Sequence, residues 1–235
     1  MSRWRWTNTA AVPTVREGRT AKMTAPTSLR AVVFDFGRVL IRYEPKEITE
    51  AIVGGGDVPL LTDVLFSEET WGRLDAGTAT NEEAAAIACR RLPERLHPAA
   101  TAVYREWIHH LPRIPGMWEL VEDLKAARQV SLYLLSNISA YFAEHADLFP
   151  VLTHFDRCFF SGVLRMVKPS ADIFLHLLGE CGLKAEETLF IDDNRENIAA
   201  AAALGMHTYL FDGDADRLAS YLSPFLKLSN PPPGS

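Results

Sequence analysis

The sequence predicts an α/β protein whose core is a doubly wound parallel sheet. Two observations favour this fold class. Five runs of four to six mostly apolar residues recur along the chain, and segments of helical character separate them. Strands that are apolar on both faces are typical of parallel sheets buried between two layers of helices. Their alternation with helices is the pattern of a doubly wound sheet.

The expected strands are short, rich in Val, Ile, Leu, Phe and Tyr, and flanked by polar or turn residues. They cover residues 31–34, 130–135, 157–160, 188–191 and 207–211. The expected helices of the same core cover residues 115–127, 139–149, 170–181, 196–204 and 214–226. Strand and helix therefore alternate from residue 115 onward, as the fold class requires.

One interval is too long for a simple crossover. About 70 residues, roughly 44–114, separate the first expected strand from the second, whereas a crossover needs far fewer. The pattern there predicts helices only, over residues 45–53, 58–66, 68–74, 81–92 and 97–110. Asn81 is expected as an N-cap, because acids follow it in the first turn. We therefore expect a helical insertion that caps the active edge of the sheet.

The net charge of −6 at pH 7 is unevenly spread. Residues 1–30 carry a net charge of +5, and residues 31–235 carry −11. A body this acidic is a poor general binder of nucleic acid, because phosphate contacts need a basic surface.

The composition divides the chain into four parts. Residues 1–28 have no apolar period and predict a disordered basic tail or an upstream start before Met23. Residues 29–43 and 115–228 are assigned to the α/β core, and residues 44–114 to the helical cap. The Pro-rich segment 229–235 predicts a second disordered tail.

The cysteines and the hydropathy indicate the compartment. Cys89, Cys158 and Cys181 are odd in number and far apart in the sequence, which disfavours a disulfide framework and favours a reducing, cytoplasmic environment. No apolar run reaches the roughly 18–20 residues that a membrane span needs, so no membrane partner is expected. The sequence leaves monomer and homodimer open.

Candidate functional residues with polar or charged side chains follow the expected strands, at the carboxyl ends where a parallel sheet binds its ligands. Asp35 follows the first strand, Ser136 the second, and Asp192 and Asp193 the fourth, while Lys168 lies beyond the third. Carboxylates from two strands suit a hard cation such as Mg²⁺. A lysine and a hydroxyl suit phosphate oxygens. Together these residues predict a phosphoryl-transfer site.

Four segments in this order resemble the motifs of the haloacid dehalogenase superfamily. They are residues 34–40, 135–137, 168–169 and 190–197, and the resemblance covers roughly residues 30–226. The insertion falls where the helical type-1 cap of that family falls, so the resemblance implies a Rossmann-like core with such a cap. Within the family the chain is most similar to class IA phosphatases with an Asp-x-Gly first motif, including bacterial phosphatases of the α-D-glucose-1-phosphate type.

The resemblance implies a role for each matched residue. Asp35 would attack phosphorus and form an aspartyl-phosphate that water hydrolyses. The expected metal ligands are Asp35, the Gly37 carbonyl, Asp192 and Asp193 around Mg²⁺. The expected phosphate-binding and charge-balancing groups are Ser136, the backbone N–H of Asn137, and Lys168, with Asn197 orienting the acidic pair.

One departure from the family pattern matters. The residue two positions after the expected nucleophile, usually a second Asp that handles the leaving-group proton, is Gly37. General acid–base help is typically worth 10²–10⁴-fold. A water, a cap residue or a leaving group of low pKa would have to replace it, and an anomeric sugar phosphate fits the last case. Arg38 is also unusual, and binding of substrate and pointing into solvent are equally open.

These features predict a Mg²⁺-dependent phosphatase of a small phosphorylated metabolite, with a sugar phosphate favoured. Two alternatives remain. The first is a 2-haloacid dehalogenase-like hydrolase, against which the acidic pair at Asp192 and Asp193 speaks, since those relatives need no metal. The second is a catalytically weak protein that uses the fold for binding.

Removing residues 1–22 is expected to leave the rate of phosphate release unchanged, because the expected core begins at residue 29. The rates of the full and shortened chains would be compared at equal concentration. A large loss of rate with an unchanged thermal midpoint would contradict a dispensable tail.

Overall fold

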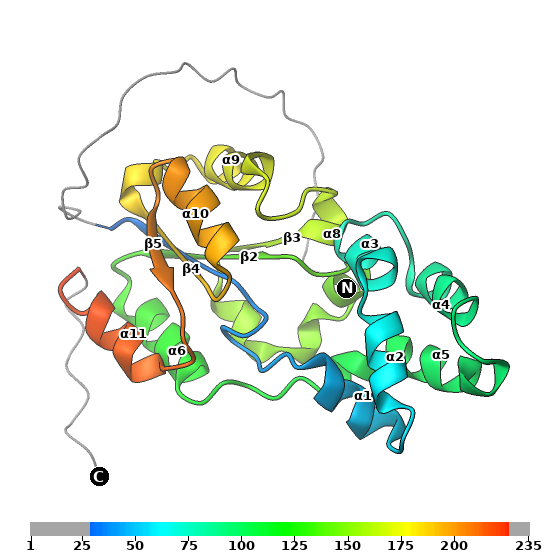
Figure 1. The fold of residues 1–235 in the computed structure, drawn as a ribbon. Coiled ribbons are helices and arrows are strands. Elements are labelled where there is room, and N and C mark those ends of the chain that lie inside the picture. Colours follow the sequence, from blue (N-terminus) through cyan, green and yellow to red (C-terminus); the bar gives the residue numbers. More distant parts are fainter. Residues whose placement is uncertain (1–28, 226–235) are drawn as a thin grey trace, which may run out of the picture.

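The computed structural model describes residues 29–225, and the predictions for residues 1–28 and 229–235 lie outside them (Figure 1). Its centre is a sheet of five parallel strands in the order β3-β2-β1-β4-β5. The strands are β1 (Ala31–Phe34), β2 (Ser131–Ser136), β3 (Arg157–Phe160), β4 (Thr188–Asp192) and β5 (His207–Leu210). Each lies within one residue of the run that predicted it, so the predicted fold class is confirmed.

Helices cover both faces of the sheet (Figure 1). One face carries α9 (Ala171–Cys181) and α10 (Arg195–Ala203), and the other carries α6 (Met117–Ala127) and α11 (Ala215–Leu222). β1 alternates between them, because Val33 packs with the residues of α9 and α10, whereas Val32 and Phe34 pack on the opposite face. All three are fully buried, which is why this strand is apolar throughout.

The strand order reverses at β1, which lies between β2 and β4. Phe34 stands opposite Leu134 on one side and Ile191 on the other. In a doubly wound sheet, ligands bind in the crevice beyond the carboxyl ends of the strands at this reversal. The residues that follow β1, β2 and β4 are therefore brought to one place.

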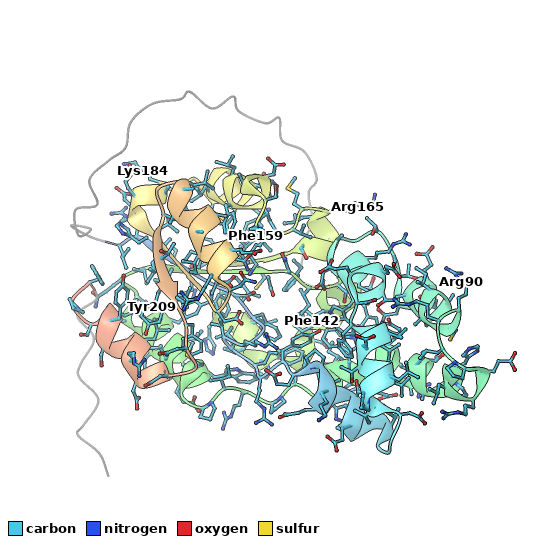
Figure 2. The ribbon with its side chains drawn as sticks, in the orientation of Figure 1. Arg90, Phe142, Phe159, Arg165, Lys184 and Tyr209 are labelled. Atoms are coloured by element: carbon cyan, nitrogen blue, oxygen red, sulfur yellow. The ribbon has the colours of Figure 1, made fainter. Side chains whose placement is uncertain are left out.

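Aromatic side chains fill both sides of the sheet (Figure 2). Phe159 belongs to the core on the α9 side, and Phe142 belongs to the core on the other side. Phe174 of α9 meets Phe190 of β4 edge to face, with ring centroids 5.2 Å apart. Burying one such ring stabilises the fold by about 1.5–3 kcal/mol. This aromatic packing on both faces supports the strand ends.

The predicted helical insertion after the first strand is confirmed, and it lies beside the sheet (Figure 1). Its elements are α1 (Pro45–Val53), α2 (Val58–Leu65), the π-helical turn η1 (Glu68–Gly72), α3 (Arg73–Asp75), α4 (Asn81–Cys89), the 3-10 turn η2 (Glu94–Leu96), α5 (His97–Glu106) and the 3-10 turn η3 (Trp107–His109).

Two helix predictions are corrected in detail. The N-cap of α4 is Thr80, not Asn81, because the Thr80 hydroxyl accepts a hydrogen bond from the backbone N–H of Glu83 while the Glu83 carboxylate accepts one from the Thr80 N–H. Asn81 instead donates to the carbonyl oxygen of Tyr104 in α5. The segment predicted as a helix over 68–74 is a π-helical turn followed by the single turn α3.

Other short elements differ from the helices that the sequence periodicity predicts. The expected helix over 139–149 divides into α7 (Ala140–Glu144) and the 3-10 turn η4 (Ala146–Leu148), and Pro150 begins the next turn, η5 (Pro150–His154). The turn η6 (Ala185–Glu187) and the helix α8 (Ser161–Leu164) are not predicted, because elements of three or four residues are too short to show a period.

Cys89, Cys158 and Cys181 are free thiols, as their spacing indicates. Within residues 29–225, no helix has both the length and the apolar character that crossing a bilayer requires.

An aromatic cluster joins the insertion to the core. Trp71 of η1 stacks on Phe66, with centroids 4.4 Å apart, and meets Trp107 edge to face at 5.0 Å. Trp107 in turn lies 6.3 Å from Phe142 of α7. Because Trp71, Trp107 and Phe142 are buried, this cluster fixes the insertion against the loops that follow the strands.

The segment after α3 touches the core backbone directly. Gly77 has φ +65°, and a β-carbon placed on it would lie 2.1 Å from the carbonyl oxygen of Gly162 in α8. A β-carbon on Gly162 would meet the backbone N of Ala140 at 2.5 Å. Only glycine at both positions allows two chain segments to approach this closely.

Gly77→Ala is expected to destabilise the protein more than Gly55→Ala. Both glycines have positive φ, but nothing lies within 4 Å of a β-carbon on Gly55. Gly55→Ala therefore costs only the left-handed backbone, about 1–2 kcal/mol. Gly77→Ala adds a backbone clash of about 1–3 kcal/mol. If urea unfolding shows that both variants lose the same free energy of unfolding, the close approach of Gly77 to the Gly162 backbone would be contradicted.

Candidate functional site

Carboxylates gather at the carboxyl ends of the two central strands. Asp35 follows β1, and its backbone N–H continues the ladder by donating to the carbonyl oxygen of Ile191 (2.9 Å). Asp192 ends β4 and is fully buried, and Asp193 beside it is half-buried. One carboxylate oxygen from each of the three lies within 4.8 Å of the others. The sheet thus brings together the three acids that the sequence predicted.

A buried lysine connects two of these acids. The Nζ atom of Lys168, in the loop between α8 and α9, lies 2.9 Å from Asp35 Oδ1 and 2.7 Å from Asp192 Oδ2. Its side chain is 1% exposed. Removing one partner of a buried ion pair typically costs about 3–5 kcal/mol, because the other charge is left without compensation. This triad is therefore a structural constraint as well as a chemical one.

The charges of the triad shift one another. The pKa of Asp35 is raised to about 6, because burial and the charge of Asp192, which raise it, outweigh the charge of Lys168, which lowers it. Burial lowers the pKa of Lys168, but the two carboxylates outweigh burial and raise it above its ordinary value. Burial, followed by the charge of Asp192, raises the pKa of Asp193, while Arg38 lowers it.

Two asparagine side chains hold the triad in place. The Asn137 side chain makes two hydrogen bonds to the backbone of Lys168. Its Nδ2 donates to the Lys168 carbonyl and its Oδ1 accepts from the Lys168 N–H, both at 2.8 Å. Asn197 of α10 donates to both carboxylate oxygens of Asp192, at 3.1 and 3.0 Å. The backbone N–H of Asn194, the N-cap of α10, also donates to Asp192 (2.8 Å). The side-chain contact of Asn137 is one that its sequence motif does not indicate.

The remaining predicted residues surround this centre. Ser136 is buried at the end of β2. Gly37 lies on the turn after β1, and a β-carbon there would meet only ordinary contact, the Tyr43 β-carbon at 3.9 Å. Arg38 adopts φ +56°, and its half-exposed side chain donates to the Tyr43 carbonyl (3.1 Å) and pairs with Glu44 (3.2 Å).

The acidic cluster fits a divalent cation. Its donors are all carboxylate oxygens, the ligand type that Mg²⁺ prefers. Burial and mutual repulsion raise the pKa of Asp35 and of Asp193, and a cation among them would offset both effects. Asp35, Asp192 and Asp193 are therefore the residues that could hold a metal.

Asp75 of α3 is a further acid that the insertion brings to this region. Its Oδ1 is shielded from solvent and has no hydrogen-bond partner. Burial raises its pKa well above the ordinary value, and the charges of Glu68 and Asp35 add to this, while Lys168 opposes it. The sequence places Asp75 in a cap-like stretch without singling it out. The only signal pointing to such a residue is the missing second carboxylate at Gly37.

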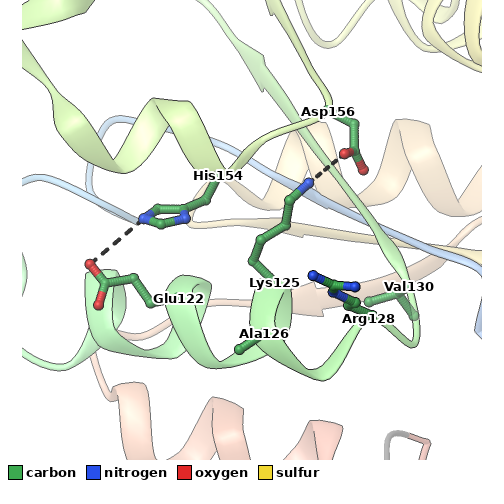
Figure 3. Close-up of a pocket in the computed structure, with 7 residues that line it drawn as sticks. All are labelled: Glu122, Lys125, Ala126, Arg128, Val130, His154 and Asp156. Carbon is green, nitrogen blue, oxygen red and sulfur yellow. Dashed lines mark hydrogen bonds and ion pairs between the residues drawn. The ribbon is translucent and has the colours of Figure 1, made fainter.

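A hollow at the opposite edge of the sheet is lined mostly by ionisable side chains, several of which lie close to one another (Figure 3). Lys125 lies 2.5 Å from Asp156, and His154 lies 3.7 Å from Glu122. Val130 and Asp156, which also line it, precede β2 and β3, so this hollow is at the amino ends of the strands. The hollow and the acidic cluster therefore lie at opposite ends of the strands.

A doubly wound sheet with an acidic cluster and a buried lysine at its carboxyl edge, beside an inserted helical segment, defines a class of hydrolases. Residues 29–205 match the family described as haloacid dehalogenase-like hydrolase. The chain belongs to this family, as its resemblance to the haloacid dehalogenase superfamily predicted.

Individual relatives cover most of the chain. A sesquiterpene phosphatase of Aspergillus oryzae is 28% identical over 184 residues, which are 77% of this chain and 88% of the relative. A D-ribitol-5-phosphate phosphatase of Bacteroides thetaiotaomicron is 23% identical over 197 residues, 80% of this chain and 94% of the relative. A solved enzyme of this family from the same bacterium, in complex with magnesium and inorganic phosphate, shares the fold with a TM-score of 0.64 at 22% identity, covering 81% of this chain and 99% of its own.

Asp35 gives the metal-free protein a distinct pH dependence. Because its folded pKa of about 6 lies above the ordinary value of 3.8, the folded protein holds this proton more tightly than the unfolded chain. Its contribution to the free energy of unfolding is thus full below pH 4 and declines as the pH rises through 6. Relative to Asp35→Asn, the wild type is expected to lose on the order of 2 kcal/mol between pH 4 and 7 in EDTA.

Urea unfolding of both chains across this range measures the difference. An advantage of the wild type that grows with pH would contradict the shift, since it would mean that Lys168 outweighs burial at Asp35.

Proposed function

We propose that this protein is a Mg²⁺-dependent phosphatase that hydrolyses a small phosphorylated metabolite through an aspartyl-phosphate on Asp35. The observation that carries the proposal is the buried triad, in which Lys168 holds Asp35 and Asp192 while Asp193 completes a set of carboxylate oxygens within 4.8 Å. Both named relatives are phosphatases, which supports the reaction class.

In the proposed first step, a carboxylate oxygen of Asp35 attacks the phosphorus of the ester. A carboxylate is a weak nucleophile, so the rate must come from positioning and charge neutralisation. Asp35 is suited to this task because β1 fixes its backbone and Lys168 fixes its side chain. Water then hydrolyses the aspartyl-phosphate and returns Asp35 to its free form.

The other site residues bind and balance charge. Mg²⁺, held by Asp35, the Gly37 carbonyl, Asp192 and Asp193, would neutralise charge on the phosphoryl group. Ser136 and the backbone N–H of Asn137 would hold phosphate oxygens at the end of β2.

Lys168 would offset the negative charge that phosphate adds to the triad. At about 4 Å and an effective dielectric of 20, one such attraction is worth about 4 kcal/mol before desolvation. The Asn137 side chain supports this role through its two hydrogen bonds to the Lys168 backbone. Asn197 would orient Asp192 from α10.

A sugar or polyol phosphate is the favoured substrate. The relative that acts on D-ribitol 5-phosphate matches 94% of its own length, which supports this class. The acidic body favours a small molecule over nucleic acid, because residues 31–235 carry a net charge of −11. A terpenyl phosphate belongs in the same substrate panel, given the sesquiterpene phosphatase among the relatives.

The purified protein is expected to release phosphate from p-nitrophenyl phosphate and from part of a panel of sugar, polyol and terpenyl phosphates. EDTA should abolish the release and Mg²⁺ should restore it. Asp35→Asn should lower kcat by at least about 1,000-fold, as loss of a nucleophile typically does. Glu122→Gln, a matched change at the opposite edge of the sheet, should leave it unchanged.

No phosphate release from any ester with Mg²⁺ would overturn the phosphatase proposal. Halide release from 2-haloacids instead would favour the dehalogenase alternative. Full activity of Asp35→Asn would remove the nucleophile from Asp35.

A further inference from the structure

The proposed reaction lacks a proton donor in the core. When the ester bond to phosphorus breaks, its electron pair goes to the leaving oxygen, and an alkoxide leaves poorly without a proton. Gly37 supplies no side chain, while Asp35 would form the new bond and Asp192 is held by Lys168 and Asn197. The identity of this missing group rests on the proposed function.

Asp75 is an acid without a structural partner. Its Oδ1 is inaccessible to solvent and makes no hydrogen bond, whereas most buried polar atoms in proteins are satisfied. An ordinary structural acid at this position would be expected to cap a helix or pair with a base. An unpaired carboxyl oxygen that is kept out of water calls for a functional explanation.

The fold holds Asp75 firmly against the core. The Ser161 hydroxyl donates to the backbone carbonyl of Asp75 at 2.5 Å. The same hydroxyl accepts from the backbone N–H of Ile138 at 2.9 Å, and Ile138 lies two residues after Ser136. Two residues after Asp75, Gly77 meets the backbone of Gly162. These contacts tie the insertion to the loop that bears the predicted phosphate-binding residues.

The groups around Asp75 raise the pKa of its carboxyl group, which favours the protonated form. Burial is the largest cause that raises its pKa, followed by the carboxylates of Glu68 and Asp35, while Lys168 opposes them. Two members of the triad, Asp35 and Lys168, are therefore among the charged groups that act on the Asp75 carboxyl group. Burial, followed by the charge that Asp75 carries when ionised, raises the pKa of the Tyr43 phenol.

We propose that Asp75 is the general acid and base of this enzyme, supplied by the inserted helical segment in place of the residue that Gly37 lacks. Its free carboxyl oxygen and its attachment through Ser161 carry this assignment. The sequence pattern and the geometry agree, because the acid missing after the first strand is present on the segment that Ser161 ties to the loop after β2.

The proton balance of both steps is complete with Asp75. As Asp35 attacks, the bond from phosphorus to the leaving oxygen breaks and that oxygen takes the proton of Asp75, so an alcohol departs. Asp75 is then a carboxylate. In the second step it accepts a proton from the attacking water, whose oxygen bonds to phosphorus. The bond from Asp35 to phosphorus breaks, its electron pair returns to Asp35, and phosphate leaves.

Leaving-group dependence separates this role from a structural one. For Asp75→Asn, kcat/KM, which reports the attack step, should fall about 100- to 10,000-fold for alkyl and polyol phosphates. It should fall much less for p-nitrophenyl phosphate, because p-nitrophenolate departs without a proton. Since the second step also loses its base, one equivalent of p-nitrophenol should appear in a burst before slow turnover. Asp63→Asn, a matched change of an exposed acid in α2 of the same insertion, should show neither effect.

A rescue variant tests the assignment independently. A β-carbon at position 37 meets nothing closer than 3.9 Å, so Gly37→Asp can supply a carboxyl group at the other position. The double variant Asp75→Asn with Gly37→Asp should regain activity on alkyl phosphates relative to Asp75→Asn alone.

Equal losses of kcat/KM for good and poor leaving groups, or an absent burst with full activity, would overturn the role of Asp75. The thermal midpoint of each variant identifies loss of activity through unfolding, and the leaving-group ratio stays readable for any folded fraction. Failure of the phosphatase proposal is distinct, because the wild type itself would then release no phosphate.

Discussion

The site depends on one buried ammonium group. Lys168 lies within 3 Å of carboxylates from two neighbouring strands, and its side chain is almost completely withdrawn from water. Two buried carboxylates at the same strand ends would repel each other without it, and the lysine would be costly to bury without them. The strand reversal at β1 creates this arrangement, because it places the ends of β1 and β4 side by side. Asn137 and Asn197 then set the positions of the lysine and of Asp192.

Much of this could be predicted from the sequence. The five strands are predictable because strands covered on both faces are continuously apolar. Asp35 and Asp192 are predictable because each is a polar residue at the end of such an apolar run. The N-cap at Thr80 and the π-helical turn at Trp71 were not predicted, since both depend on local hydrogen bonds rather than on periodicity. The hydrogen bonds between the Asn137 side chain and the Lys168 backbone join residues 31 positions apart, which no local sequence pattern encodes.

The approach of α3 to the core was equally hidden. It depends on two glycines, Gly77 and Gly162, that allow backbone to meet backbone, and on Ser161, whose hydroxyl bonds to both segments. In the proposed mechanism this contact places chemistry on both sides of the crevice, with the nucleophile on the sheet and the proton donor on the insertion. Docking of the insertion and catalysis would then be coupled, because displacement of α3 would break the hydrogen bond from Ser161 that holds Asp75 against the core.

The central claim is that the carboxylate held by Lys168 carries the phosphoryl group. The most direct measurement is mass spectrometry of peptides after acid quenching of the protein during turnover. One phosphoryl group is expected on the peptide that contains Asp35, present with Mg²⁺ and absent in EDTA. A phosphoryl group on any other residue, or an active enzyme that never acquires one, would contradict it.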